Sequence, residues 1–321
     1  MVVDPPFPRT GVDYPGTWPD FRSRFRNDTD CAAYLEQLRW GDGFCCPKCE
    51  SKKGWRIADG GWSCAGCARK VSVTAGTIFD RSRTSLQEWF TAAWYVTNQK
   101  YGVSALGLQR VLGLGSYQTA WTLLHKLRTA MVRPGRDRLQ GSVEVDETYV
   151  GGVEEGVRGR ETHEKSIVVM AVEVLSPKGF GRVRMHRIPD VSGNSLIPFV
   201  CDAVQPGAVV HTDGWSGYND LPKHGFTRKK VILSNTRDPA HVSMPAVHQV
   251  ASLLKRWLLG THQGSVTPAH LNAYLDEFTF RFNRRHSRRR GLLFYRLLEH
   301  AVVTAPTRYR PPRGQKPTHN L

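Results

Sequence analysis

The chain has 321 residues, 40% of them hydrophobic, which suits roughly two or three domains with buried cores. Lys and Arg total 45 against 28 Asp and Glu, and the resulting charge of +17 makes nucleic acid the first candidate for a partner. No apolar run reaches the about 18 residues that a membrane span needs, and the N-terminus carries Pro and Asp where a signal peptide is apolar. We therefore expect neither a membrane protein nor a Sec-exported one.

The first half of the chain predicts three consecutive parts. Residues 1–28 are rich in Pro, Gly and Arg and are expected to form a flexible lead-in. Residues 29–80 combine a helix with a cysteine-rich module. Residues 84–133 are expected to be helical, and a Pro-Gly pair at 134–135 marks a break.

The second half, over 142–300, changes to short β-type runs, which predict a sheet interrupted by a helix over 195–204 and followed by helices over 246–259 and 268–285. The final residues, 304–321, contain Pro and Arg with few apolar side chains and predict a flexible basic tail. The five expected strands are 143–150, 166–175, 182–188, 208–213 and 229–233.

Two CxxC pairs form the strongest motif. A CxxC turn places two thiolates on one side of a tight loop, and two such turns can surround one Zn²⁺ tetrahedrally. Because four cysteines leave no open position for water, the expected zinc is structural. An odd total of seven cysteines with this spacing favours a reducing compartment over a disulfide framework. The predicted ligands are Cys46, Cys49, Cys64 and Cys67, whereas Cys45 lacks the spacing and Cys31 and Cys201 are expected to be packing residues.

Residues 102–131 fit two helices joined by a tight Gly turn, which is the spacing of a helix-turn-helix. A helical hairpin that serves only packing is the alternative, and the net charge favours contact with DNA. The residues expected where a recognition helix meets bases are Ser116, Tyr117, Gln118 and Thr119.

Two aspartates stand out in the β-rich region. Asp146 lies inside an apolar strand, where a carboxylate is costly unless a metal or other partners satisfy it. Asp213 ends the next apolar run before a Gly. Each alone can be turn chemistry, but a pair on neighbouring strands can bridge divalent cations for reaction at a phosphate. On the later helix, His248 and Lys255 lie two turns apart on one side, which suits one group at the metals and a cation at DNA.

The motifs CPKC, CAGC, VEVDETYVGG, HTDGWSGYNDL, VASLLKRWLLGTHQG and HLNAYLDEFTFRFNRR resemble, in the same order, those of the ISXO-like insertion-sequence transposases. The resemblance spans roughly residues 30–300. It implies an α/β fold in which an RNase H-like mixed-sheet core of DDE type follows a small zinc ribbon and a helical segment. It also implies that Asp146 and Asp213 are the first two catalytic carboxylates and that Lys255 is the basic residue seven positions after the third ligand.

The third-ligand position, usually Glu or sometimes Asn in the family, is occupied here by His248. An imidazole suits Mg²⁺ poorly, whereas Mn²⁺ accepts nitrogen more readily. Either His248 is the third ligand of a variant triad, or the copy is weakened or inactive. Glu277 is a possible substitute acid, although its spacing favours an ion pair with Arg281.

The resemblance implies metal-dependent strand cleavage at the ends of an insertion sequence, followed by attack of the freed 3′-OH on target DNA. The implied cofactors are structural Zn²⁺ and catalytic Mg²⁺ or Mn²⁺. The implied partners are the element's terminal repeats, target DNA and further copies of the chain in a homo-oligomer, in the cytoplasm of a bacterium. A rival interpretation is an inactive or domesticated DNA-binding protein derived from such a transposase, and a second rival is a nuclease without strand transfer.

The stretch RFNRRHSRRR over 281–290 places six arginines in ten residues. Contacts from such side chains to phosphates raise affinity without reading sequence and weaken steeply with salt. A solvated helix end is the alternative. The expected phosphate contacts are Arg284, Arg285, Arg288, Arg289 and Arg290, together with Lys255 of the preceding helix.

Overall fold

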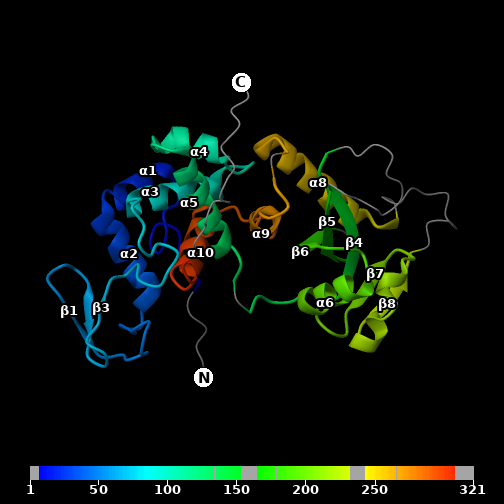
Figure 1. Ribbon diagram of the computed structural model, residues 1–321, viewed down its shortest axis with the longest axis horizontal. Coiled ribbons are helices and arrows are strands. Elements are labelled where there is room, and N and C mark those ends of the chain that lie inside the picture. Colours follow the sequence, from blue (N-terminus) through cyan, green and yellow to red (C-terminus); the bar gives the residue numbers. More distant parts are fainter. Residues whose placement is uncertain are drawn as a thin grey trace. The chain divides into compact units, whose positions relative to one another are not determined.

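The computed structural model describes residues 7–133, 135–152, 165–177, 179–231, 243–264 and 266–307. The chain divides into two compact units, labelled unit 1 and unit 2 below (Figure 1). Unit 1 comprises Met1–Val96, Ala105–Ala130 and Phe294–Leu321, and unit 2 comprises Thr97–Ser104 and Met131–Leu293. In the parts that the structure describes, no helix has the length and apolar character of a membrane span.

Unit 1 is mainly helical, and its core is aromatic. Its rings meet at short centroid distances, such as 4.8 Å between Phe25 and Phe90 and 5.5 Å between Phe21 and Phe294. Such edge-to-face pairs add to the stabilisation from burial alone. The helices that supply this unit are α1 (Trp18–Arg24), α2 (Asp28–Trp40), α3 (Leu86–Asn98), α4 (Ala105–Leu112), α5 (Tyr117–Ala130) and α10 (Gly291–Ala301).

The described part of the lead-in, from residue 7 to 28, differs from the flexible segment expected from its composition. Thr17 caps α1 by accepting from the Asp20 amide at 3.3 Å, and a proline stands in the first turn, where it favours a helix start. Phe21 is only 2% exposed, and Phe25 is equally buried. The composition of this segment is dominated by Pro, Gly and Arg, and it hid a short helix with two aromatic residues.

The position of helix α10 differs from the expected domain boundary, which placed residues up to 300 in the α/β region. Its sequence is contiguous with the α/β region, but Phe294 and the residues after it belong to unit 1. Phe294 is fully buried and packs against Phe21, Phe90 and Trp94. These contacts join residues that lie far apart in the sequence, so local patterns carry no signal for them.

The cysteine module is a three-stranded antiparallel sheet formed by β1 (Gly54–Arg56), β2 (Trp62–Cys64) and β3 (Lys70–Val71). Trp55 pairs with Ser63, and Ser63 pairs with Lys70. The expected hairpin between the two CxxC turns is therefore present, and Cys46 and Cys64 are buried beside Phe44 in a small local cluster.

Unit 2 is built on a mixed five-stranded sheet in the order β6-β5-β4-β7-β8. Strand β4 pairs antiparallel with β5, and β5 pairs antiparallel with β6. On the other side, β4 pairs parallel with β7, and β7 pairs parallel with β8. This order and these directions are those of an RNase H-like core, which confirms the expected fold class. The strands are β4 (Ser142–Val150), β5 (Ser166–Val174), β6 (Phe180–Ile188), β7 (Val209–Thr212) and β8 (Thr227–Lys230).

Helices cover both faces of this sheet (Figure 1). On one face, α6 (Gly193–Ala203) and the short helices η1 (Ser216–Tyr218) and η2 (Leu221–His224) pack over Val143 and Val145. On the other, α8 (Pro245–His262) and α9 (Leu271–Phe282) pack over Val168, Met170 and Val172. Because side chains alternate along a strand, Glu144 and Asp146 lie on the face that carries α8.

The bounds of several elements differ from the expectation, and those of β8 and α9 are examples. Strand β8 covers 227–230 rather than 229–233, and residues 232 and 233 lie outside the described ranges. It is an edge strand with mostly exposed polar side chains, so an apolar run was the wrong signal for it. Helix α9 starts at Leu271 because residues 267–270 form a separate turn, closed by the His270 amide on the Thr267 carbonyl at 3.0 Å.

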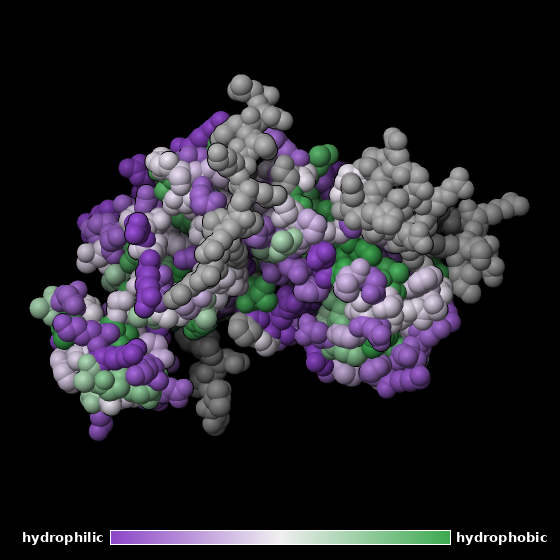
Figure 2. Space-filling model, viewed as in Figure 1, coloured by the Kyte–Doolittle hydropathy of each residue, from purple (hydrophilic) through white to green (hydrophobic). Residues whose placement is uncertain are grey.

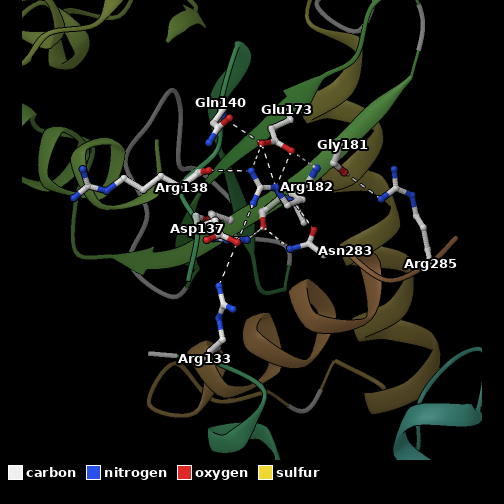
Figure 3. Close-up of polar contacts among 11 residues, drawn as sticks. Arg133, Asp137, Arg138, Gln140, Glu173, Gly181, Arg182, Asn283 and Arg285 are labelled. Atoms are coloured by element: carbon white, nitrogen blue, oxygen red, sulfur yellow. Dashed lines mark hydrogen bonds and ion pairs between the residues drawn. The ribbon is translucent and has the colours of Figure 1, made fainter. Parts of the chain in front are cut away.

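A polar network attaches the segment before β4 and the end of α9 to strands β5 and β6 (Figure 3). Arg182 of β6 pairs with Glu173 of β5 at 2.7 Å, and Glu173 also accepts from the Gln140 amide at 3.0 Å. Asn283, just after α9, accepts from the Val183 amide at 2.7 Å. These contacts fix the entry to β4 and the end of α9 on the same two strands.

The predicted basic tail lies mostly outside the described ranges, which end at residue 307. On the face in Figure 2 the described surface is mainly hydrophilic, and hydrophobic side chains appear in separate patches.

Candidate active site and metal centre

The four CxxC cysteines converge. Their sulfur atoms all lie within 4.8 Å of one another, with 3.7 Å between Cys46 and Cys67 and 3.5 Å between Cys49 and Cys64. Among the described residues, this is the one group of three or more potential ligands found that close together. Four thiolates at this spacing suit a tetrahedral structural site.

Backbone amides prepare two of these thiols for a cation. Burial disfavours the thiolate of Cys46, but the N–H groups of Lys48 and Cys49 outweigh it and lower the pKa. Cys64 is likewise desolvated, yet hydrogen bonds from the backbone of Cys67 lower its pKa to about 6. Each CxxC turn thus directs its own amides at its first sulfur, and a thiolate is the form that binds metal.

The remaining cysteines take no part in this cluster. Cys45 directs its sulfur to the Glu50 carbonyl at 3.7 Å, as expected from its lack of CxxC spacing. Cys31 is buried, and Cys201 is half-buried against the apolar cluster on the α6 face of unit 2. Both positions agree with packing roles.

Asp146 and His248 meet across the α8 face of the sheet. The distance from His248 Nε2 to Asp146 Oδ2 is 3.9 Å, with the side chains 34% and 19% exposed. Burial raises the pKa of Asp146, and the negative charge of Asp213 raises it further, whereas Glu147 and His248 act in the opposite direction. A half-buried carboxylate repelled by a second one is an environment that a cation would stabilise.

Asp213 comes level with Asp146 through the parallel pairing of β4 and β7. Glu144 pairs with His211, and extending that register by two residues aligns Asp146 with Asp213. Neighbouring strands lie about 4.8 Å apart. Asp213 also accepts from the Trp215 amide at 3.0 Å, so the turn chemistry considered from the sequence is present.

Arg228 of β8 holds the loop that carries Asp213. Its guanidinium donates to the Asp213 carbonyl at 3.0 Å and to the Trp215 carbonyl at 2.8 Å, and its Nε donates to the Thr212 hydroxyl at 2.9 Å. Sequence reasoning missed this residue, because nothing in the run TRKK distinguishes a loop clamp from a solvated cation.

Glu144 anchors the helix that carries His248. Its side chain accepts from the Val247 amide in the first turn of α8 at 2.9 Å, and the residue is 6% exposed. Met244, at the N-cap of α8, makes no side-chain cap of its own. Glu144 and Asp146 are two residues apart on one face of β4. This strand therefore carries the Asp146 carboxylate and also anchors α8, the helix that faces it. The motif VEVDE contained this signal, but only Asp146 was selected from it.

Comparison with known proteins shows which family these residues belong to. Residues 138–283 match the ISXO2-like transposase domain, and residues 26–70 match the transposase zinc-ribbon domain, so that the two matches together cover more than half of the chain. The chain belongs to the ISXO2-like transposases. It is also similar to a protein of Halobacterium salinarum described as an uncharacterized protein in transposable element ISH50, with 28% identity over 280 residues that cover 80% of this chain and 91% of that protein.

The matched transposase domain contains Asp146, Asp213, His248 and Lys255. Lys255 is exposed on α8, seven residues after His248, while Val247, Val250 and Leu254 of the same helix are buried in the core. Glu277 is fully buried and pairs with Arg281 at 3.3 Å, which confirms the ion pair favoured by its spacing.

The transposase also exposes most of its expected DNA-contacting residues. Ser116, Tyr117, Gln118 and Thr119 are all exposed at the start of α5, where Ser116 caps the helix by accepting from the Thr119 amide at 3.1 Å. Helices α4 and α5 pack together as the expected hairpin.

The arginines after α9 divide into two groups. Arg285 donates to the carbonyls of Gly181 and Phe180 and lies 4.0 Å from the centre of the Phe282 ring, which gives it a structural role on β6 (Figure 3). Arg284 lies 4.0 Å from the centre of the Phe280 ring. Arg288 and Arg289 are exposed, and Arg290 is half-buried.

Proposed function

We propose that this transposase is a DDE-type DNA strand-transferase in which His248 takes the position of the third ligand. The observation that carries the proposal is the meeting of His248 and Asp146 at 3.9 Å, with Asp213 close enough for its charge to raise the Asp146 pKa. Asp146 lies on β4, Asp213 directly follows β7, and His248 lies on α8.

The donor set fits a divalent cation that accepts nitrogen. Two carboxylates supply hard oxygen ligands and one imidazole supplies nitrogen, a combination that Mn²⁺ tolerates better than Mg²⁺ does. Such an ion would activate water or a 3′-OH and neutralise charge at the phosphate. We therefore expect Mn²⁺ to support more activity than Mg²⁺.

The residues of the chain would hold and orient the reactants. Asp146 and Asp213 would fix the cation, and His248 would complete its ligands. Lys255, exposed two turns further along α8, would contact a DNA phosphate. Glu144 and Arg228 would position α8 and the Asp213 loop through the hydrogen bonds described above.

The proposal extends to the rest of the chain. The cysteine cluster would hold one structural Zn²⁺, and the α4–α5 hairpin with the arginines at 284–290 would bind the element's terminal repeats and target DNA. Further copies of the chain would assemble in the active complex, in the cytoplasm of a bacterial cell.

A cleavage assay tests the proposal. Labelled duplexes carrying the DNA that flanks the gene are incubated with the protein and Mn²⁺, and nicked and joined products are separated on gels. We expect both products from the wild type and neither from Asp146→Ala or Asp213→Ala. Asp220→Ala removes an exposed carboxylate from the neighbouring loop and is the matched control, with unchanged activity. Equal cleavage by wild type and Asp146→Ala would refute the proposal, and nicks without joined products would indicate a nuclease.

Two further variants test the imidazole. His248→Ala is expected to abolish cleavage, and His248→Glu is expected to retain or raise it with Mg²⁺, because a carboxylate suits that ion. Unchanged activity in His248→Ala would remove the residue from the site.

A further inference from the structure

A cavity of about 780 Å³ in unit 2 is not used by the proposed metal site. It is lined by residues of α8, by the end of α9 and the segment after it, and by Lys100 and Tyr101. Its size falls within the range of sites for small molecules, about 300–1,000 Å³. The chemistry of its walls indicates what it binds.

Part of the lining is aromatic, and one of its rings is exposed. Tyr101 is 63% exposed, although its carbonyl accepts from Trp257 Nε1 at 2.8 Å and from the Thr261 hydroxyl at 2.7 Å. These bonds fix the Tyr101 backbone on α8 and leave its ring at the cavity. Trp257 and Phe278 line the same cavity from the core. A fixed, exposed ring provides a stacking surface for a flat ligand.

The lining is also cationic, and Lys100 Nζ lies 5.5 Å from the centre of the Tyr101 ring. Lys100, Arg256, Arg281, Arg285 and Arg290 line the cavity, and no Asp or Glu is among its described lining residues. Glu277 is fully buried outside this lining and pairs with Arg281.

Two arginines of this lining, Arg281 and Arg290, repel each other. Burial lowers the pKa of Arg281, and the positive charge of Arg290 lowers it further, against the effect of Glu277. Arg285 is held by carbonyls, which do not neutralise its charge. An anion seated in the cavity would relieve this repulsion.

We propose that this cavity binds one unstacked nucleotide of a DNA strand, with the base on Tyr101 and the adjoining phosphate at Arg256 and Arg290. The inference rests on the proposed function, because that function supplies DNA as the ligand. A nucleotide combines a flat apolar surface with a negative charge, which matches a lining of aromatic and cationic side chains. Arg256 follows His248 by eight residues on α8, about 12 Å along the helix, so a strand bound along α8 reaches both.

Binding of defined oligonucleotides tests the assignment without any cleavage. Fluorescence anisotropy measures the Kd of the full chain in EDTA for oligothymidylate of about 12 nucleotides, a length within known single-strand site sizes. An abasic oligonucleotide of the same length provides the phosphates without bases, and a duplex provides bases that stay stacked.

Tyr101→Ala is expected to weaken oligothymidylate binding about tenfold, the scale of one lost base–aromatic contact. Tyr101→Phe should bind as the wild type does. Neither variant should change binding of the abasic strand by more than about twofold, because no base is present to stack. Arg256→Ala should weaken both single strands, and Arg187→Ala, an exposed arginine of β6 outside the cavity, is its matched control.

Three results would overturn the inference: equal losses for Tyr101→Ala on abasic and base-containing strands, no loss on either, or no binding of single strands by the wild type. An acidic peptide that displaces the oligonucleotide from the wild type but not from Tyr101→Ala would instead assign the cavity to a protein partner. The side chain of Tyr101 is largely exposed, so circular dichroism and melting of Tyr101→Ala should match the wild type. Normal DNA cleavage with no base-dependent Tyr101 effect would refute this inference alone, whereas base-dependent binding without cleavage would refute only the proposed function.

Discussion

The link between Glu144 and the first turn of α8 is the feature of unit 2 that sequence reasoning did not foresee and that the site depends on most. The carboxylate is 6% exposed and accepts from the Val247 amide at 2.9 Å. Glu144→Ala removes a helix cap, which costs about 1 kcal/mol, and a charge-assisted hydrogen bond, which is worth about 1.5–3 kcal/mol. Because the two contributions overlap, we expect the free energy of unfolding to fall by about 2–3 kcal/mol.

The same substitution should lower activity beyond its effect on stability. With the cap lost, the first turn of α8 is free to shift, and a displacement of about 1 Å in a reacting group can cost about a hundredfold in rate. Glu144→Gln keeps an acceptor oxygen and should recover much of both losses. The assays are urea unfolding of the full chain and the Mn²⁺-dependent cleavage assay, at a temperature where each variant is folded.

A matched variant separates stability from positioning. Glu88 of α3 in unit 1 accepts from the Ser85 amide at 2.9 Å and also caps a helix. Glu88→Ala should cost about 1 kcal/mol and leave cleavage per folded molecule unchanged. The reasoning about Glu144 is wrong if Glu144→Ala unfolds like the wild type, or if Glu144→Gln is as impaired as Glu144→Ala.

Three other features yield predictions. Elemental analysis should find about one zinc per wild-type chain and none in the Cys46→Ser, Cys64→Ser double variant; folded wild type without zinc would contradict the ribbon site. Burial raises the pKa of Asp276 from 3.8 to about 6, so the folded state holds this proton more tightly than the unfolded chain, and stability should fall by about 3 kcal/mol as pH rises from about 4 through 6. Asp276→Asn should flatten that profile in urea unfolding at several pH values, and an unchanged profile would exclude Asp276 as its origin. Arg228→Ala should lower cleavage with little change in DNA affinity, because it loosens the Asp213 loop; equal losses in both measurements would argue against a positioning role.

Much of the fold was predictable because it follows from local patterns. The CxxC spacing identified the four cysteines that cluster in the zinc ribbon and excluded Cys45, and apolar runs located the four strands that are buried. Alternation along VEVDETYV and helical periodicity after Ala246 placed Asp146 and His248 on specific elements. Their convergence then followed from the resemblance to a known family rather than from periodicity.

The features that the sequence did not predict depend on contacts between distant segments. The return of Phe294 to the aromatic core of unit 1 has no local signature. The roles of Glu144 and Arg228 arise from pairing with α8 and with the loop after β7. Polar residues of this kind look solvated in a sequence until the partner element is known.

The central claim is that Asp146, Asp213 and His248 together bind one divalent cation. The most direct test is a titration of metal-free protein with Mn²⁺, in which the electron paramagnetic resonance signal reports the free ion. The account predicts saturable binding by the wild type, a loss of at least about tenfold in affinity in Asp146→Ala, and wild-type affinity in the control Asp220→Ala. Equal Mn²⁺ affinity in the wild type and Asp146→Ala would contradict it.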